Sequence, residues 1–348
     1  MNDFSNRKRF LLVAGIDFGT SFTKVIVQEQ SDGYAQVVTF NDEEWLFPSV
    51  IGCCDGILEG PFYNPLKNPI PYLKMHIASV FSDGTSIDQL PPNLRELLRV
   101  DTYAPSRDLL AWYFANVLSA VKHFISTQSR WRDFDFAGKN QMDRFVVQVC
   151  IPTGYMENED AKRCFHEALA LAYKLSDRIS PYMNQACPFM DWRRLCSKES
   201  DHIAGLCRSL CFTYPEVAAG VQCILRSPTA QDGLYVTVDV GAGTIDMNAF
   251  RRYTAQGVAG IDERPNRLDY YAAKVAPYGI ARIAGKRSRD SFALYTHILW
   301  DGESELSLPR MPEADVMKQV ANQFEDLFAC AQHYQKNLKP LGASWSDD

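Results

Sequence analysis

Two short segments of the chain combine aspartate, glycine and hydroxyl residues in a spacing that suits phosphate binding. The first, GIDFGTSFTK at residues 15–24, places Asp17 at the end of an apolar run and follows it with Gly19, Thr20, Ser21 and Thr23. A tight turn after a strand exposes consecutive backbone N–H groups, and hydroxyls add further donors. The carboxylate of Asp17 would repel a phosphate unless a cation stood between them, which implies magnesium held largely through water. The alternative is a β-hairpin turn in which Asp and Gly serve only the geometry.

The second segment, VDVGAGTIDM at residues 238–247, repeats the same arrangement. It contains Asp239, then Gly241 and Gly243 on either side of an alanine, then Thr244 and Asp246. The paired glycines allow the backbone to approach a ligand closely. Because a plain hairpin turn needs neither paired glycines nor a second copy of the pattern, the two segments together favour phosphate binding.

Hydrophobic periodicity and turn residues predict the elements that position these segments. In the first part of the chain we expect strands at 10–18, 23–29, 34–40 and 145–151, an amphipathic helix at 107–127, a helix at 157–175, and irregular structure with short helices at 60–106. Further on we expect an insertion at 176–209, strands at 210–214, 233–240 and 244–251, and helices at 215–226, 266–285 and 313–338. This succession predicts an α/β protein of two similar lobes.

Composition excludes several classes of protein. The 348 residues are 46% hydrophobic, which fits a folded chain, and their net charge of −6 argues against a broad nucleic-acid surface. No apolar run approaches the roughly 20 residues of a membrane-spanning helix. The basic start at Arg7 is followed by an apolar run that stops at Asp17, so we expect a buried strand and no signal peptide. The ten cysteines form no C-x-x-C pair, so we expect reduced thiols, no zinc and a cytoplasmic protein.

The two segments resemble the phosphate loops of the actin-like ATPase superfamily, and within it the nucleotide-binding domain of the seventy-kilodalton heat-shock chaperones and their bacterial relatives. Residues 145–172 resemble the strand, proline corner and helix of that family, and TYPEVAAG at 213–220 resembles the start of its connecting helix. The resemblance covers about residues 10–285. It implies two ribonuclease H-like lobes, here 1–228 and an incomplete 229–348, with ATP and magnesium in the cleft between them.

The resemblance also implies roles for individual residues. Asp17 and Asp239 would hold the hydrated magnesium, and Lys74 would orient the attacking water. Glu216, which resembles the placement in plasmid-partitioning actin-like proteins, would also orient this water. The residues expected to contact the phosphates are Gly19, Thr20, Ser21, Phe22 through its backbone, Gly241, Ala242, Gly243 and Thr244. For Lys74 the alternative is an ordinary surface lysine, and for Glu216 it is an acidic residue that favours a helix N-terminus.

The C-terminal part departs from the family pattern. Family members carry an adenosine loop with a Gly-Gly pair, and this chain contains no such pair; the nearest match, LGAS at 341–344, does not follow a strand. Arg282, Lys286 and Arg287 either face the base or form a solvated helix surface. We therefore expect weak discrimination between ATP and GTP, within about tenfold.

The sequence thus predicts an ATP- and magnesium-binding protein of the heat-shock-chaperone-like branch, with slow hydrolysis serving a nucleotide-dependent switch. Its expected partners are ATP, ADP and an unidentified protein, and no client binding through a following β-domain is expected. The alternatives are an interaction module that has lost nucleotide turnover, an actin-like filament protein, and a small-molecule kinase, because DFGTSFTK also looks like sugar kinases.

Overall fold

The computed structural model describes residues 9–40, 44–62, 66–81, 88, 90–98, 101–136, 143–151, 158–180, 186–225, 227–241, 245–253 and 267–276. The chain forms two compact units, Met1–Pro215 and Glu216–Asp348. Both contain strands and helices, so the fold is mixed α/β. The boundary expected between residues 228 and 229 lies after α7 (Glu216–Leu225), the first helix of the second unit.

The central sheet of the first unit has the strand order β10-β8-β1-β2-β3. Its strands are β1 (Leu11–Phe18), β2 (Phe22–Glu29), β3 (Ala35–Val37), β8 (Arg144–Ile151) and β10 (Cys211–Pro215). The first three form the expected antiparallel meander, and the short β4 (Phe47–Pro48) also pairs with β2. Strand β8 runs parallel to both β1 and β10, so the sheet is mixed.

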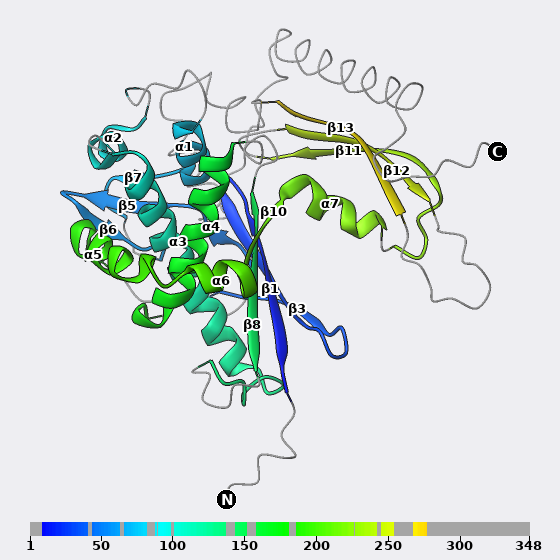
Figure 1. The fold of residues 1–348 in the computed structure, drawn as a ribbon, viewed down its shortest axis with the longest axis horizontal. Coiled ribbons are helices and arrows are strands. Elements are labelled where there is room, and N and C mark those ends of the chain that lie inside the picture. The colour runs from blue at the N-terminus through cyan, green and yellow to red at the C-terminus, as the bar shows by residue number, and fades with distance from the viewer. Residues whose placement is uncertain are drawn as a thin grey trace, which may run out of the picture. The chain divides into compact units, whose positions relative to one another are not determined.

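Two long helices, α3 (Tyr103–Thr127) and α4 (Glu159–Leu175), lie on one face of this sheet (Figure 1). Alternate residues of β1 and β8 are buried beneath them, as the period of a strand requires. Helix α4 begins where expected, and the Asn158 side chain caps it by accepting a hydrogen bond from the backbone of Ala161.

Helix α3 differs from the amphipathic helix that its sequence predicts. Every residue from Asp108 to Val121 is buried, although the pattern predicts a polar outer face. The reason is that α3 is also contacted by α1 (Leu73–Val80), α2 (Pro92–Leu98) and α5 (Phe189–Ser200) (Figure 1). A helix enclosed in this way belongs to the core of the unit.

A second sheet of the first unit has the order β7-β5-β6-β9. Its strands are β5 (Ile51–Cys54), β6 (Ile57–Glu59), β7 (Pro69–Ile70) and β9 (Ala186–Pro188). Asp55 and Gly56 join β5 to β6 with positive φ angles of 50° and 73°. Strand β9 belongs to the expected insertion, which also contains the 3-10 helix η3 (Ser176–Arg178), α5 and α6 (Ala204–Ser209).

The second unit contains an antiparallel sheet of the order β11-β12-β13 together with α7. The hairpin of β11 (Gly233–Val240) and β12 (Ile245–Tyr253) is the expected one. The helix predicted at 266–285 is wrong, because residues 267–276 form strand β13 (Arg267–Ala276) along β12. Tyr270 and Tyr271 have strand propensity, and the edge of β12 supplies the hydrogen bonds of a ladder. Residues 277–285 and the helix expected at 313–338 lie outside the described residues.

Within the described ranges, no helix is both long and apolar enough to cross a lipid bilayer. The eight cysteines whose side chains the structure describes are all free thiols. Several of them are deeply buried, among them Cys164, Cys196 and Cys211, and burial raises the pKa of each of these thiols. They therefore behave as small apolar side chains.

Candidate functional site

The first segment forms the turn of the β1–β2 hairpin. Strand β1 ends at Phe18, β2 begins at Phe22, and the amide of Gly19 donates to the carbonyl of Asp17 over 3.1 Å. A Cβ atom at Gly19 would collide with the carbonyl oxygen of Phe22. The turn therefore requires glycine at this position, whatever else the segment does.

The three hydroxyl residues of the first segment, Thr20, Ser21 and Thr23, have different surroundings. Thr23 is buried and structural: its Oγ accepts from the Tyr113 hydroxyl over 2.7 Å and lies 3.1 Å from the Ser49 Oγ. Burial raises the pKa of Tyr113, so its phenol stays protonated and serves as the donor. Thr20 is also buried and lies within the turn itself.

Ser21 has a hydroxyl that forms no hydrogen bond with the described part of the chain, although this atom is buried. Its backbone is fixed, because its carbonyl accepts from the amide of Ser49 over 2.9 Å. A buried hydroxyl without a partner is costly, and native structures keep few of them. The Ser21 hydroxyl is therefore a candidate donor to a bound ligand.

Asp17 presents a carboxylate that is about half exposed at the end of β1. Its cross-strand neighbour is Lys24, whose Nζ lies 3.4 Å from the Asp17 Oδ2. Such an exposed pair contributes only about 0–1 kcal/mol, so a bound cation can replace the lysine at little cost. The Asp17 carboxylate is a hard oxygen donor, which fits magnesium.

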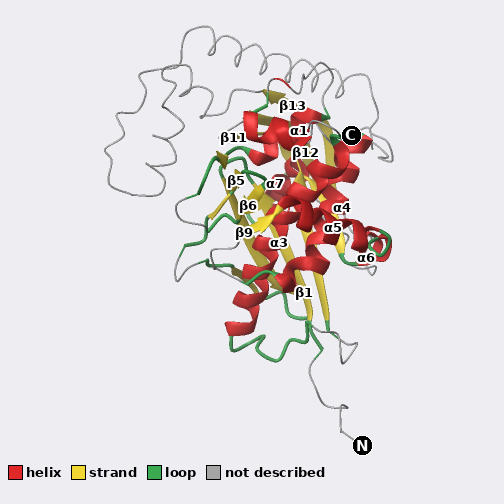
Figure 2. Cartoon of the chain, turned by 90° about the vertical axis from the view of Figure 1, so that its left-hand side faces the viewer, coloured by secondary structure: helices red, strands yellow, loops and turns green. Residues whose placement is uncertain are grey.

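Lys74 lies in the first turn of α1 and is 3% exposed, so it is no surface lysine. A buried ammonium is rare in proteins and disfavoured near a helix N-terminus. Helix α1 lies at the same end of the central sheet as the carboxyl end of β1 (Figures 1 and 2). That end carries the Asp17–Phe22 turn, so the fold places Lys74 and the turn at one end of the unit.

The second segment forms the turn between β11 and β12 in the second unit. Asp239 is exposed, Gly241 is half-buried, and the expected contacts Ala242, Gly243 and Thr244 lie outside the described residues. Asp246 is buried and lies directly opposite Asp239 in the ladder, so the two side chains point to the same face. Like charges in this arrangement are destabilising unless a cation offsets them.

Asp246 is the residue that reasoning from the sequence did not assign to the site. The signal was present, because Asp239 and Asp246 stand at matching distances on either side of the glycine-rich turn, and a hairpin pairs such positions. In the first hairpin the same position is occupied by Lys24, so the two turns are electrostatically different.

Glu216 begins α7 and is half-buried. It follows Pro215, the last residue of β10. Strands β1, β8 and β10 run parallel, so their carboxyl ends lie at one edge of the central sheet, where open α/β sheets bind ligands. The favourable interaction of Glu216 with the N-terminus of α7 is equally consistent with its position.

Among the described residues, no group of three or more His, Cys, Asp or Glu side chains is arranged to hold a metal. Magnesium needs fewer protein ligands than zinc does, because it is usually held by one or two carboxylates together with phosphates and water. Comparison with protein-family models and with curated proteins gives no match to this chain. The assignment of function therefore depends on the residues of the two hairpins.

Proposed function

We propose that this protein binds ATP with magnesium through its two Asp-Gly hairpin turns. In this proposal it is a member of the heat-shock-chaperone-like branch of the actin-like ATPases, with two ribonuclease H-like lobes. It hydrolyses ATP slowly and acts as a nucleotide-dependent switch for a protein partner. A switch needs only a difference in conformation between the ATP and ADP states, so slow turnover suffices.

The observation that carries the proposal is the repeated hairpin. In each unit the second-last residue of a strand is an aspartate, a turn with glycine follows, and the next strand runs antiparallel. The first turn adds the buried, unpartnered hydroxyl of Ser21, and the second adds the opposed carboxylates of Asp239 and Asp246. An anion with its cation accounts for both features, since the phosphate accepts from the hydroxyl and the metal separates the carboxylates.

Each residue has a defined task in this proposal. Magnesium, held by Asp17 and Asp239 largely through water, would neutralise the charge of the phosphates. The backbone amides of Thr20, Ser21 and Phe22 and the Ser21 hydroxyl would donate to phosphate oxygens. Phosphoryl transfer requires positioning and charge stabilisation more than covalent chemistry.

Lys74 and Glu216 are proposed to orient the attacking water and to stabilise the charge that develops on transfer. Both interact with other groups of the chain. Replacement of either by alanine should therefore slow phosphate release while ATP affinity stays within a few-fold. Unchanged rates in both variants would contradict their catalytic role.

The decisive experiment is calorimetric titration of ATP and magnesium into the parent and three variants. Asp17→Asn and Asp239→Asn should each weaken binding by about tenfold or more. Asp133→Asn, at an exposed aspartate of the loop that follows α3, is the matched control and should bind as the parent does. Equal affinities in all four proteins would refute the site.

Two further measurements separate the proposal from its rivals. Parent protein that binds no ATP would be a nucleotide-free interaction module. Light scattering that rises on addition of ATP would indicate filaments, and phosphate release that requires an added acceptor would indicate a small-molecule kinase. A switch predicts release without an acceptor and no polymer.

A further inference from the structure

The outer strand β11 of the second unit has one edge that no described strand covers. The sheet has the order β11-β12-β13, so β11 pairs with β12 on one side only (Figure 2). A strand directs alternate N–H and C=O groups to each of its two sides. The eight residues Gly233–Val240 therefore present a row of backbone donors and acceptors that can pair with a further strand.

The corresponding strand of the first unit is paired on both sides. Strand β1 also belongs to a hairpin and also carries an aspartate, Asp17, as its second-last residue. Its other side pairs in parallel with β8. The outer side of the first hairpin is thus occupied, whereas that of the second hairpin has no partner within the described part of the chain.

The other outer strand of the second sheet, β13, is protected in ways that β11 is not. Natural sheets protect their edges with charged residues, proline, bulges or very short strands. Strand β13 contains Arg267, Asp269 and Lys274, and its register with β12 shifts once. Strand β11 has eight residues, no proline, an unbroken register with β12 and a single charged residue, Asp239. Its edge is therefore open to pairing.

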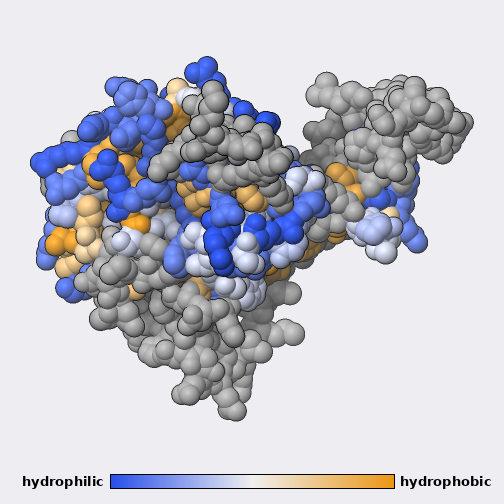
Figure 3. Space-filling model, turned by 90° about the horizontal axis from the view of Figure 1, so that it is seen from below, coloured by the Kyte–Doolittle hydropathy of each residue, from blue (hydrophilic) through white to orange (hydrophobic). Residues whose placement is uncertain are grey.

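One face of β11 is apolar and partly exposed. Four apolar residues alternate along the strand and so share this face: Leu234, Val236, Val238 and Val240. Leu234 and Val240 are each 51% exposed and Val238 is 43% exposed, although Met247 beside Val238 on β12 is buried. Helix α7 packs against β12 and β13. Hydrophobic residues also reach the surface elsewhere, in patches between hydrophilic ones (Figure 3), but on β11 they accompany an unpaired strand edge.

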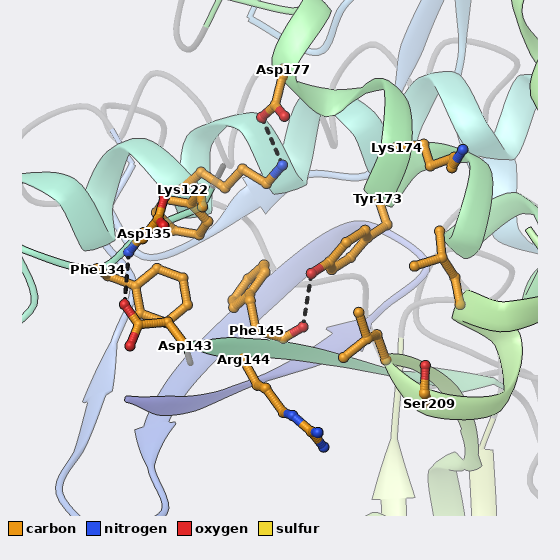
Figure 4. Close-up of a pocket in the computed structure, with 13 residues that line it drawn as sticks. Lys122, Phe134, Asp135, Asp143, Arg144, Phe145, Tyr173, Lys174, Asp177 and Ser209 are labelled. Carbon is orange, nitrogen blue, oxygen red and sulfur yellow. Dashed lines mark hydrogen bonds and ion pairs between the residues drawn. The ribbon is translucent and has the colours of Figure 1, made fainter. Parts of the chain in front are cut away.

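The cavity of the first unit offers a partner fewer unpaired groups. It has a volume of about 530 Å³, and several of the polar groups around it are already paired (Figure 4). Lys122 Nζ lies 2.7 Å from the Asp177 Oδ1, and the Tyr173 hydroxyl donates to the carbonyl of Phe145 over 3.0 Å. The backbone edge of β11 is therefore the stronger basis for an interaction.

We propose that β11 pairs with β11 of a second copy of this chain, antiparallel and about a two-fold axis at Thr237. Hydrophobicity is symmetric about this residue, because Val236 and Val238 flank it and Leu234 and Val240 lie three positions away on either side. In this register Leu234 of one copy lies opposite Val240 of the other, and Val236 lies opposite Val238. Opposed residues of an antiparallel pair share a face, so the apolar faces of the two sheets become continuous.

Charge does not oppose this pairing. Asp239 is the only charged residue of β11, and in this register it lies opposite Tyr235 of the other copy. The two Asp239 residues lie on either side of the axis, roughly 14 Å apart from the rise of a strand. This separation exceeds the screening length of about 8 Å at physiological salt. A slip of one residue would place apolar side chains opposite polar ones, so the alternation specifies the register.

The size of the contact determines its strength. The paired residues Leu234–Val240 form an edge roughly 24 Å long, and a sheet with its side chains is roughly 10 Å thick. The two copies together then bury on the order of 500 Å², which is below the roughly 1,200–2,000 Å² of a stable complex. We therefore expect a weak, reversible dimer with a dissociation constant of about 10–100 µM. A two-fold contact is closed, so this dimer does not extend into a filament.

Sedimentation velocity of the full chain, without nucleotide because the pairing does not depend on ATP, tests the association. The parent should change from monomer to dimer between about 5 and 500 µM. Val238→Lys places a charge on the paired edge and should weaken dimerisation by about tenfold or more. Val37→Lys is the matched control, because Val37 is also 43% exposed and lies on β3, an outer strand of the central sheet. It should dimerise as the parent does.

Cross-linking tests the register. Thr237 of each copy lies at the two-fold axis, where opposed Cα atoms are about 4.5–5.5 Å apart, within the range of a disulfide. Thr237→Cys should therefore yield a covalent dimer on oxidation with diamide, beyond any background of the parent. Leu234→Cys should not, because its two copies would be about 20 Å apart.

Any of three results would overturn the proposal. They are a parent that stays monomeric at the highest concentration, equal dimerisation of the two lysine variants, and cross-linking of Thr237→Cys that does not exceed that of Leu234→Cys. A monomeric parent would leave the edge of β11 to a strand of another protein.

Discussion

Replacement of Ser21 by alanine should raise the stability of the protein and lower its affinity for ATP. The Ser21 hydroxyl is buried and forms no hydrogen bond with the described residues, so the folded protein carries its desolvation cost. That cost is about 1–3 kcal/mol for a buried polar group. Alanine removes the hydroxyl and leaves the Cβ in place, so we expect the free energy of unfolding to rise by about 1 kcal/mol.

The effect on ATP has the opposite sign. A hydroxyl that donates to a charged phosphate oxygen contributes about 1.5–3 kcal/mol, so its loss should weaken binding by about tenfold or more. Urea denaturation and thermal melting measure the first effect, with an expected rise in Tm of roughly 2–4 °C for a unit of this size. Calorimetric titration with ATP and magnesium measures the second.

Ser106 on α3 provides the control. Its hydroxyl is likewise buried and unpartnered within the described chain, but it lies on a core helix and outside the hairpin turn. Ser106→Ala should therefore stabilise the protein to a similar extent as Ser21→Ala does, and it should leave ATP affinity unchanged. If Ser21→Ala destabilises the protein, or if both variants bind ATP as the parent does, the assignment of Ser21 as a ligand donor is wrong.

Three further perturbations follow from described contacts. Gly19→Ala introduces a Cβ against the Phe22 carbonyl and should cost about 1–3 kcal/mol of stability, whereas Gly205→Ala meets no atom within 4 Å and should cost nothing; urea midpoints compare the two. Tyr113→Phe removes the donor to Thr23 and should cost about 1–3 kcal/mol in the same assay, so an unchanged midpoint would contradict a structural role for that hydroxyl. Burial lowers the pKa of His76 from 6.5, so the imidazole is protonated at a higher pH in the unfolded state than in the folded state. The free energy of unfolding therefore falls as the pH drops below about 6.5. His76→Gln should flatten this pH dependence of the free energy of unfolding, and an equally steep curve would show that another group is responsible.

The strands of the central sheet could be predicted well from the local sequence. Alternating burial makes β1 and β8 recognisable, and glycine and aspartate mark their turns. The hairpin of β5 and β6 was not anticipated, although Asp55-Gly56 is a strong signal for a tight hairpin turn. It was hidden because the flanking strands are short.

Features that depend on distant contacts could not be predicted from one sequence. Strand β13 exists because β12 offers an edge to pair with, and no local pattern reports that edge. The same holds for the burial of Lys74 and for the missing partner of the Ser21 hydroxyl, since both depend on neighbours far along the chain. The residue types of the first hairpin were enough to propose a phosphate loop. The ion pair between Asp17 and Lys24 could be predicted only from the pairing register of β1 and β2.

The strand order of the central sheet also determines when it can assemble during synthesis. Strand β1 pairs on one side with β2, which follows at once, but on its other side with β8, whose residues are separated from those of β1 by more than a hundred positions. A growing chain therefore carries the β1–β2 hairpin with an unpaired edge until β8 has left the ribosome. Synthesis proceeds at about 5–20 residues per second. The unpaired N–H and C=O groups of such an edge can pair with other chains. The nascent protein therefore passes through an aggregation-prone interval of several seconds or more. The sheet is complete only after β10 has been synthesised, because this strand is the last segment of the first unit.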